Sequence, residues 1–251
     1  MRQSIACGIH AVRVLLLRSP GRVKRVHLAA GRSAGRLAEL QQIAQRSGVA
    51  VLEADPATLD RLAEGQRHQG AVAEVLPRSG DPETQLEEAL AVAEGPPLLL
   101  VLDGLQDPHN LGACLRSADA AGVHAVLAPR DRAVGLTPVV RKVAAGAADA
   151  VPFITVVNLA RTLRDLRSRG LWLVGLDADG ERSIYEADFR GPLALVLGAE
   201  GQGLRRLTRE NCDQLVSIPM AGSVESLNVS VATGVVLFEA VRQRGKRGGR
   251  G

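Results

Sequence analysis

The sequence predicts an α/β protein whose larger part is built on a parallel sheet, and three observations support this prediction. From residue 98 onward, apolar runs of strand length alternate with segments of helical periodicity. Residues 1–75 show the same alternation on a smaller scale. Residues 76–96 between them are acidic and begin with turn residues. We therefore expect a small α/β domain over 1–75, a linker over 76–96, a parallel-sheet domain over 97–243 and a basic tail over 244–251.

The first region contains six segments whose patterns indicate either a helix or a strand. In chain order they are Ile9–Leu17, Val26–Leu28, Leu37–Ala44, Val49–Leu52, Leu59–Ala63 and Ala71–Val75. The linker that follows opens with Leu-Pro-Arg-Ser-Gly-Asp-Pro, and a short helix is expected over Glu83–Ala93, before Gly95-Pro96-Pro97.

The second region has the clearer pattern. Its expected strands are Leu98–Leu102, Val123–Leu127, Val151–Val157, Leu171–Leu176, Leu193–Leu197 and Leu215–Ile218. The expected helices are Leu111–Ala121, Val139–Ala147, Leu159–Arg169, Leu204–Glu210 and Leu227–Arg242. Strands that alternate with helices imply parallel pairing, and ligands of such sheets bind beyond the carboxyl ends of the strands.

Composition limits the possible functions. Apolar residues make up 46% and charged residues 23%, an ordinary balance for a globular protein. No apolar run approaches the roughly 20 residues that cross a bilayer, and no signal peptide is evident, so we expect a cytoplasmic protein without a membrane partner. Aromatic residues are only 2% of the chain, which argues against an RNA platform built by base stacking.

Charge favours a polyanionic partner without proving one. Residues 1–75 hold eleven basic residues against six acidic ones, and Arg22, Lys24 and Arg25 form the densest basic cluster. A solvated surface is the alternative explanation for this cluster. The tail is also basic, and a solubilising role explains it equally well. Three widely separated cysteines with no CxxC pair give no metal-ligand spacing, so no metal is expected.

Three polar clusters follow predicted strands. The first, residues 107–118, opens a helix, with Asn110 as its expected N-cap and Arg116 six residues later, near the strand ends. The second, residues 197–204, is a glycine-rich loop that contains Gly198 and Glu200. It lacks the GxGxxG spacing and the early position of a dinucleotide-binding loop, which disfavours a nucleotide-dependent oxidoreductase.

The third cluster, residues 218–230, joins the last predicted strand to the last helix. Ser226 and Asn228 fall where that helix begins, so both could be helix caps. Small polar residues are dense here, which is typical of a loop that lines a ligand site. None of the three clusters identifies a function alone.

Taken together and in this order, the three clusters resemble the motifs of the SpoU family of RNA ribose methyltransferases, part of the SPOUT class. The family's motifs match Asn110 to Arg116, Leu197 to Leu204 and Ile218 to Asn228. The resemblance covers the whole chain, because Gly8–Val12 is similar to the start of the family's small RNA-binding domain, which has a ribosomal-protein-like fold. It is strongest to members that methylate a guanosine in the peptidyl-transferase P loop of bacterial 23S rRNA.

The resemblance implies a deep trefoil knot in the catalytic domain, formed by loops around 198–203 and 218–228. It also implies S-adenosylmethionine as methyl donor, with Gly198, Ile218 and Leu227 as cofactor contacts by matching position. A homodimer is implied as well, with the last helix at its interface. The RNA partner is then 23S rRNA or a large-subunit assembly intermediate.

The family's catalytic positions match Asn110, Arg116, Glu200, Ser226 and Asn228. Arg116 is the central candidate, and we favour an electrostatic role over that of a base, because a guanidinium keeps its proton in proteins. Asn110 and Asn228 are expected to orient Arg116 and the ribose, and Glu200 and Ser226 to fix the loops or the target nucleotide. By the same resemblance, Arg22, Lys24 and Arg25 are candidate phosphate contacts. Action on tRNA or on another rRNA nucleotide, and RNA binding without catalysis, remain the alternatives.

Overall fold

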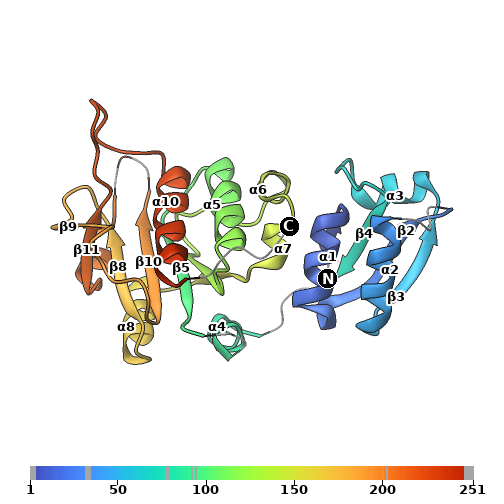
Figure 1. Cartoon of the computed structure of the whole chain (residues 1–251), viewed down its shortest axis with the longest axis horizontal. Coiled ribbons are helices and arrows are strands. Elements are labelled where there is room, and N and C mark those ends of the chain that lie inside the picture. The colour runs from blue at the N-terminus through green and yellow to red at the C-terminus, as the bar shows by residue number, and fades with distance from the viewer. Residues whose placement is uncertain are drawn as a thin grey trace. The chain divides into compact units, whose positions relative to one another are not determined.

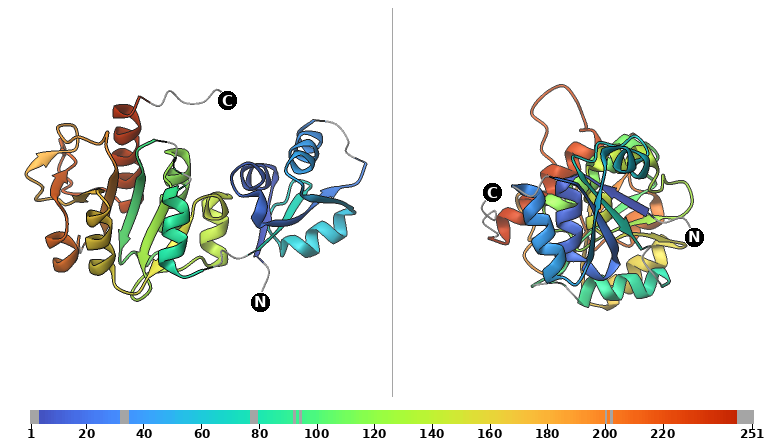
Figure 2. Two further views of the ribbon diagram at one scale, coloured as in Figure 1. Left: turned by 90° about the horizontal axis from the view of Figure 1, so that it is seen from below. Right: turned by 90° about the vertical axis from the view of Figure 1, so that its right-hand side faces the viewer.

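A computed structural model describes residues 4–31, 35–76, 80–91, 93, 95–199, 201 and 203–245. The chain folds as two compact units, which we describe separately. Unit 1 comprises residues 1–80 with 145–150, and unit 2 comprises residues 81–144 with 151–251. Each unit is a sheet with helices packed against it (Figures 1 and 2).

Unit 1 is a four-stranded mixed sheet in the order β1-β4-β2-β3. Only β2 and β3 pair in parallel. Helices α1 and α2 pack on one face over a core around Leu15, Leu40 and Val26, and α3 covers part of the other face through Leu59 and Ala63. The elements are β1 (Ser4–Cys7), α1 (Ile9–Arg18), η1 (Pro20–Arg22), β2 (Val23–Ala29), α2 (Arg36–Arg46), β3 (Ala50–Ala54), α3 (Pro56–Ala63), β4 (Ala71–Val75) and α7 (Ala147–Ala150).

Unit 2 is a seven-stranded sheet in the order β7-β6-β5-β10-β8-β11-β9, and every neighbouring pair is parallel. Its strands are β5 (Leu98–Asp103), β6 (Ala125–Pro129), β7 (Phe153–Val156), β8 (Trp172–Leu176), β9 (Arg182–Ser183), β10 (Leu193–Gly198) and β11 (Gln214–Ser217). Its helices are α4 (Pro82–Ala91), α5 (Pro108–Ala120), α6 (Pro138–Ala144), α8 (Leu159–Ser168), α9 (Arg206–Glu210) and α10 (Val229–Gln243). The predicted α/β class with a parallel sheet is confirmed.

Continuous apolar strands explain why this sheet is covered on both faces. All six residues of β5 are buried, as are five of the six in β10, which is typical of central parallel strands. Helices α4 and α8 pack on one face through Leu86 and Leu163. Helix α10 packs against α5 and β10, and the two helices lie side by side in Figure 1. Strands β10, β8 and β11 are adjacent and parallel, so the loops that follow them meet at the carboxyl ends of the strands.

Several predicted boundaries were wrong for local reasons. The helix expected over Val139–Ala147 is broken between α6 and α7, where Ala145 and Gly146 both take positive φ angles of 50° and 97°. Strand β1 and the two-residue β9 were not predicted, because both are too short to show a period. The helix expected in the linker is α4, and the side chains of its Leu86 and Ala89 belong to the core of unit 2. The trefoil knot and the domain boundaries remain predictions.

Candidate functional site

The glycine-rich loop after β10 is folded back tightly on the end of its own strand. The N–H of Gly203 donates to the carbonyl of Ala199 at 3.0 Å, which closes a one-bridge antiparallel turn. A Cβ atom on Gly198 would lie 2.0 Å from the carbonyl carbon and oxygen of Gly203. Gly201 and Gly203 have φ angles of 75° and 61°, in the left-handed region that favours glycine. Glycine at 198 is thus required by close backbone approach, and at 201 and 203 it is favoured by backbone conformation.

An ion pair between buried Asp103 and the partly exposed Arg205 anchors the far end of this loop. Asp103 ends β5, directly beside Gly198 in the sheet register, and its side chain is fully buried. Its carboxylate accepts a hydrogen bond from Nε of Arg205 at 2.7 Å and another from the Arg205 backbone N–H at 3.1 Å. The loop from 199 to 204 is therefore fixed at both ends, by the strand at Gly198 and by Asp103 at Arg205.

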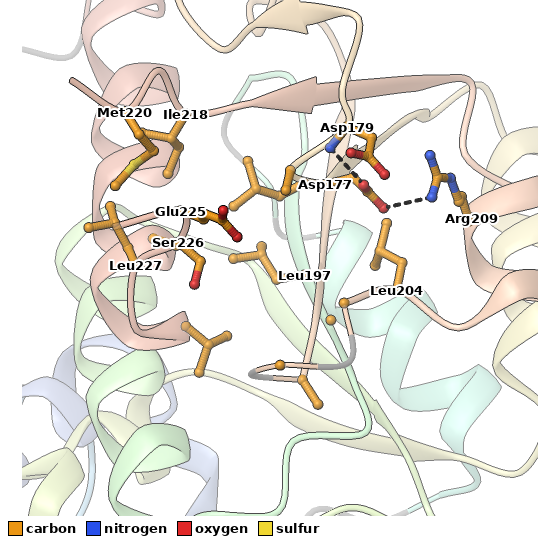
Figure 3. A pocket seen from close by; sticks show the side chains of 18 residues that line it. Asp177, Asp179, Leu197, Leu204, Arg209, Ile218, Met220, Glu225, Ser226 and Leu227 are labelled. Carbon is orange, nitrogen blue, oxygen red and sulfur yellow. Dashed lines mark hydrogen bonds and ion pairs between the residues drawn. The ribbon is translucent and has the colours of Figure 1, made fainter. Parts of the chain in front are cut away.

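A cavity of about 430 Å³ opens beside this loop, at the carboxyl ends of β8, β10 and β11. Figure 3 shows its side chains converging from these loops and from the start of α10. Its volume lies in the usual range for small-molecule sites. The lining residues are Leu176, Asp177, Ala178, Asp179, Leu197, Gly198, Ala199, Gly201, Gly203, Leu204, Arg209, Ile218, Met220, Glu225, Ser226, Leu227, Val229 and Ala232.

Four residues predicted for the site line this cavity. Gly198, Ile218 and Leu227 are the expected cofactor contacts, and Ser226 lies next to Leu227. Gly198 ends β10, whereas Ile218 and Leu227 both belong to the loop between β11 and α10. The structure therefore brings the second and third sequence clusters together. Their contact with a cofactor is not tested by this observation and stays a prediction.

The same cavity has a charged side, formed by Asp177 and Arg209, that the sequence patterns did not indicate. The Asp177 carboxylate accepts the backbone N–H of Asp179 at 3.0 Å and lies 3.5 Å from Nη1 of Arg209, as the dashed lines in Figure 3 show. Its side chain is only 10% exposed. One signal could have found it: Asp177 directly follows the predicted strand 171–176, in the position where parallel sheets present ligand-binding residues.

The first sequence cluster begins helix α5, but its cap was wrongly predicted. Asp107, not Asn110, is the N-cap, and its carboxylate accepts the backbone N–H of His109 at 3.0 Å. Pro108 occupies the first helical position, where its missing N–H is harmless. Asn110 thus lies inside the first turn, half-buried, and its amide is available for other contacts.

Asn110 and Asn228 are brought together, although 118 positions separate them. The Asn228 Nδ2 donates to Oδ1 of Asn110 at 3.1 Å. Asn228 is also the N-cap of α10, as expected, because its Oδ1 accepts the backbone N–H of Ser230 at 2.9 Å. Ser226, the other candidate cap, lies two residues before this cap.

Arg116 is not joined to these groups in the described part of the chain. Arg116 is exposed on α5, and within the described residues its side chain makes no hydrogen bond or ion pair. Glu200 lies outside the described residues. The structure therefore unites two of the five predicted catalytic residues and leaves an unengaged guanidinium on the same helix as Asn110.

In unit 1, Glu74 organises part of the predicted basic cluster. Its carboxylate lies 2.9 Å from Nε2 of His27, 3.4 Å from Nε of Arg25 and 3.6 Å from Nζ of Lys24. Burial alone would raise the pKa of Glu74, but the His27 hydrogen bond and the two cations outweigh it and lower the pKa. Arg22 donates to the carbonyl of Leu76. More than a third of each of the Lys24 and Arg25 side chains is exposed, so both can still bind a polyanion.

Other chemistry finds little support in the part of the chain described here. No group of three or more His, Cys, Asp or Glu residues among the described positions could hold a metal ion. Burial raises the pKa of Cys114 to about 11 and that of Cys212 to about 12, so both thiols stay protonated and unreactive at neutral pH. No helix within the described ranges is long and apolar enough to span a membrane.

Comparison with known families matches both units. The model of the SpoU rRNA methylase family matches residues 97–238. A second family model, RNA 2′-O ribose methyltransferase substrate binding, matches residues 5–79. The second range, 5–79, lies entirely within unit 1. The first, 97–238, lies within unit 2 except for residues 145–150, which belong to unit 1.

Individual relatives match along almost the whole chain. The chain is 58% identical over 237 residues to the 23S rRNA (guanosine-2′-O-)-methyltransferase RlmB of Pseudomonas putida, covering 94% of this chain and 95% of the relative. It is 56% identical over 243 residues to the protein of the same name from Ralstonia nicotianae, covering 97% of each. Among solved structures, it is similar to the SpoU methyltransferase AviRb from Streptomyces viridochromogenes in complex with AdoMet, with a TM-score of 0.72, 26% identity, and coverage of 96% of this chain and 90% of that one.

Proposed function

This chain belongs to the SpoU rRNA methylase family, and on that premise we propose that it methylates the ribose 2′-hydroxyl of a guanosine in 23S rRNA, with S-adenosylmethionine as methyl donor. The observation that carries the proposal is the near-complete match to relatives of that name, across both units. The target we infer within 23S rRNA is the peptidyl-transferase P loop. The physiological form is either free 23S rRNA or a large-subunit assembly intermediate.

The cavity beside β10 suits this cofactor. It is large enough for a nucleoside-sized molecule, and its lining combines apolar side chains with the polar residues Asp177, Asp179, Arg209, Glu225 and Ser226. We assign Gly198, Ile218 and Leu227 as the residues that hold it. When bound, the cofactor supplies a methyl group on a sulfonium, which is already a good leaving group. The reaction therefore needs no metal.

The task left to the protein is to activate and align the 2′-hydroxyl, which is almost wholly protonated at neutral pH. A positioned cation stabilises the developing alkoxide while the hydroxyl proton passes to solvent water. Arg116 is assigned this role, because it is a solvent-facing guanidinium without a partner in the described residues and can bind a neighbouring phosphate with its planar fork. Alignment of the attacking oxygen with the methyl carbon can contribute about 7–11 kcal/mol in favourable systems.

The remaining site residues act by position. Asn110 and Asn228, already joined by a hydrogen bond, are assigned to orient the ribose and Arg116. Ser226 and Glu200 are assigned to hold the loops or the target nucleotide. The exposed cations of unit 1, Lys24 and Arg25, are candidate phosphate contacts that add affinity without sequence preference.

The working form is proposed to be a cytoplasmic homodimer that uses α10 in its interface. Val231 and Phe238 on this helix are both 51% exposed. They lie seven residues apart, so they fall on the same side of the helix. Two large apolar side chains on one exposed stripe favour a protein interface, and a second copy of this chain is the proposed occupant.

Radiolabelled methyl transfer to unmodified 23S rRNA, followed by alkaline hydrolysis, tests the function. A 2′-O-methyl group blocks cleavage at its own nucleotide, so the modified position is read as one missing band. We expect a single gap at the P-loop guanosine, absent with Arg116→Ala. A folded protein that binds cofactor but transfers nothing to 23S rRNA would contradict the assignment, and transfer to tRNA instead would favour a different substrate within the family.

A further inference from the structure

The direction of the Asn228 amide is fixed by chemistry. The backbone N–H of Ser230 lies 2.9 Å from one atom of that amide group, and a backbone N–H can only donate. The atom facing it must therefore be the oxygen, Oδ1. The Ser230 hydroxyl donates to the same oxygen at 2.6 Å, so this residue holds Oδ1 with two hydrogen bonds.

The direction of the Asn110 amide follows from that of Asn228. With its oxygen held by Ser230, Asn228 directs its NH₂ group toward Asn110, 3.1 Å away. An NH₂ group can only donate, so the Asn110 atom that meets it must be Oδ1. The Asn110 NH₂ group then lies on the opposite side of its amide. Among the described residues it donates to no acceptor, and the residue is only half-buried.

We propose that Ser230 is a positioning residue, and that the chain from Ser230 through Asn228 to Asn110 presents the Asn110 NH₂ group as a hydrogen-bond donor to an oxygen of the bound RNA. This inference rests on the proposed function. It assigns Asn110 the polarity of a donor toward the RNA, because its Oδ1 faces Asn228 and its NH₂ group faces away. The RNA oxygen is either the attacking 2′-oxygen or a phosphate oxygen, both of which carry negative charge in the transition state. A donor that is held in place before the reaction needs no reorganisation when that charge develops.

Substitution of Asn110 separates a donor from an acceptor. Asn110→Asp keeps an inner oxygen for Asn228 but turns the outward group into an acceptor. We expect Asn110→Asp and Asn110→Ala each to lower kcat/KM by roughly 10- to 100-fold, the size for a hydrogen bond to a charged group. A fall in kcat assigns the donor to the 2′-oxygen, whose charge grows only during the reaction, and a rise in KM alone assigns it to a phosphate. Near wild-type turnover by Asn110→Asp would overturn the proposal.

A double-mutant cycle tests whether Ser230 acts through Asn110. Ser230→Ala removes the hydroxyl but keeps the backbone N–H, so we expect a loss of about fivefold, and Ser230→Thr should restore most of it. In an Asn110→Ala background, Ser230→Ala should have no further effect. Ser168→Ala on α8, whose hydroxyl donates to the Asp165 carbonyl of its own helix, is the matched control and should not change turnover. Equal losses in both backgrounds would assign Ser230 an unconnected structural role and contradict the proposal.

Side-chain amide NMR tests the chain of hydrogen bonds without any turnover, so its failure is distinct from failure of the proposed function. In the free protein, the Asn228 NH₂ protons should exchange slowly and those of Asn110 rapidly. Ser230→Ala should speed exchange at Asn228 and shift the Asn110 amide signals. Protected Asn110 protons, or Asn110 signals unmoved by Ser230→Ala, would overturn the inference even if methyl transfer to 23S rRNA is confirmed.

Discussion

Two neighbouring parts of unit 2 are built in different ways. At the cavity, the end of β10 leaves no room for a side chain, because a Cβ on Gly198 would meet the main chain of Gly203. On α5 and at the start of α10, the candidate groups are side chains, namely Asn110, Arg116 and Asn228, and Arg116 is exposed. The first part is shaped by close main-chain approach, whereas the second is shaped by side-chain hydrogen bonds.

This difference predicts which substitutions each part tolerates. The cavity wall at Gly198 cannot accept a new atom, because two segments of main chain approach closely there. A site made of side chains keeps its fold after substitution and loses only the chemistry. Cofactor binding and methyl transfer should therefore be separable by mutation.

The largest effect is expected from Gly198→Ala. The added Cβ would meet backbone atoms of Gly203 at 2.0 Å, so the loop and strand must separate. We expect cofactor affinity, measured by calorimetry with S-adenosylhomocysteine, to fall by about 100-fold or more, a shift of at least roughly 2.7 kcal/mol. Gly191→Ala, with no atom within 4 Å of the new Cβ, is the matched control. Unchanged affinity in Gly198→Ala would mean that the close approach of Gly198 to Gly203 does not shape the cofactor site.

Arg116→Lys should lower kcat by about 100-fold while the cofactor affinity stays unchanged. The lysine keeps the charge but loses the planar, two-pronged donor that fits a phosphate. Single-turnover kinetics with saturating 23S rRNA measures this step. Near-normal turnover would show that a positive charge at position 116 is sufficient and that the planar guanidinium is not required.

Asp103→Asn tests the anchor that joins the two ends of the cavity loop. Loss of the buried charge weakens both contacts to Arg205, so we expect the free energy of unfolding to fall by about 2 kcal/mol and cofactor affinity to fall several-fold. Urea unfolding and calorimetry report the two effects. Asp188→Asn, which alters an exposed pair with Arg190, should change neither. A stability loss without a change in affinity would make the anchor purely structural.

A smaller effect is expected from replacing Arg22, Lys24 and Arg25 together by Ala. Each lost phosphate contact should reduce the slope of log affinity against log salt by about 0.7–0.9. Filter binding of 23S rRNA at several salt concentrations measures the slope. The double variant Arg161→Ala with Arg164→Ala on α8 removes two positive charges outside the cluster and should leave the slope unchanged. An unchanged slope would show that these three residues form a solvated surface and do not contact RNA phosphates.

The smallest effect concerns Glu74 and pH. Its folded pKa lies below the ordinary 4.5, so the charged carboxylate stabilises the fold at neutral pH, and this contribution is lost as pH falls from 4.5 through the folded value. Urea midpoints measured between pH 3 and pH 6 should fall toward acid less steeply for Glu74→Gln than for the wild type. Parallel curves would show that this carboxylate is not linked to folding.

The strands and most helices of unit 2 could be predicted because buried parallel strands are continuous apolar runs. The site was predicted only in part. Asn228 follows from its position at a helix start, but the cap at Asp107 was missed because Asn110 is an equally good cap by type.

Other features depend on contacts that no local pattern records. The hydrogen bond between Asn110 and Asn228 joins residues 118 positions apart. The approach of Gly198 to Gly203 depends on how the loop folds back, which the glycines permit but do not specify. The pair of Asp103 with Arg205 likewise requires two distant segments to meet.

The most direct test of the central claim measures both activities of Arg116→Ala on one preparation, with cofactor affinity from calorimetry and single-turnover methyl transfer to unmodified 23S rRNA. We predict that the dissociation constant of the cofactor stays within about twofold of wild type, because Arg116 does not line the cavity. Methyl transfer at the target guanosine should be lost. Transfer that persists, or cofactor affinity that is lost with it, would contradict the division between the cofactor cavity at the end of β10 and the RNA-directed side chains of α5 and α10.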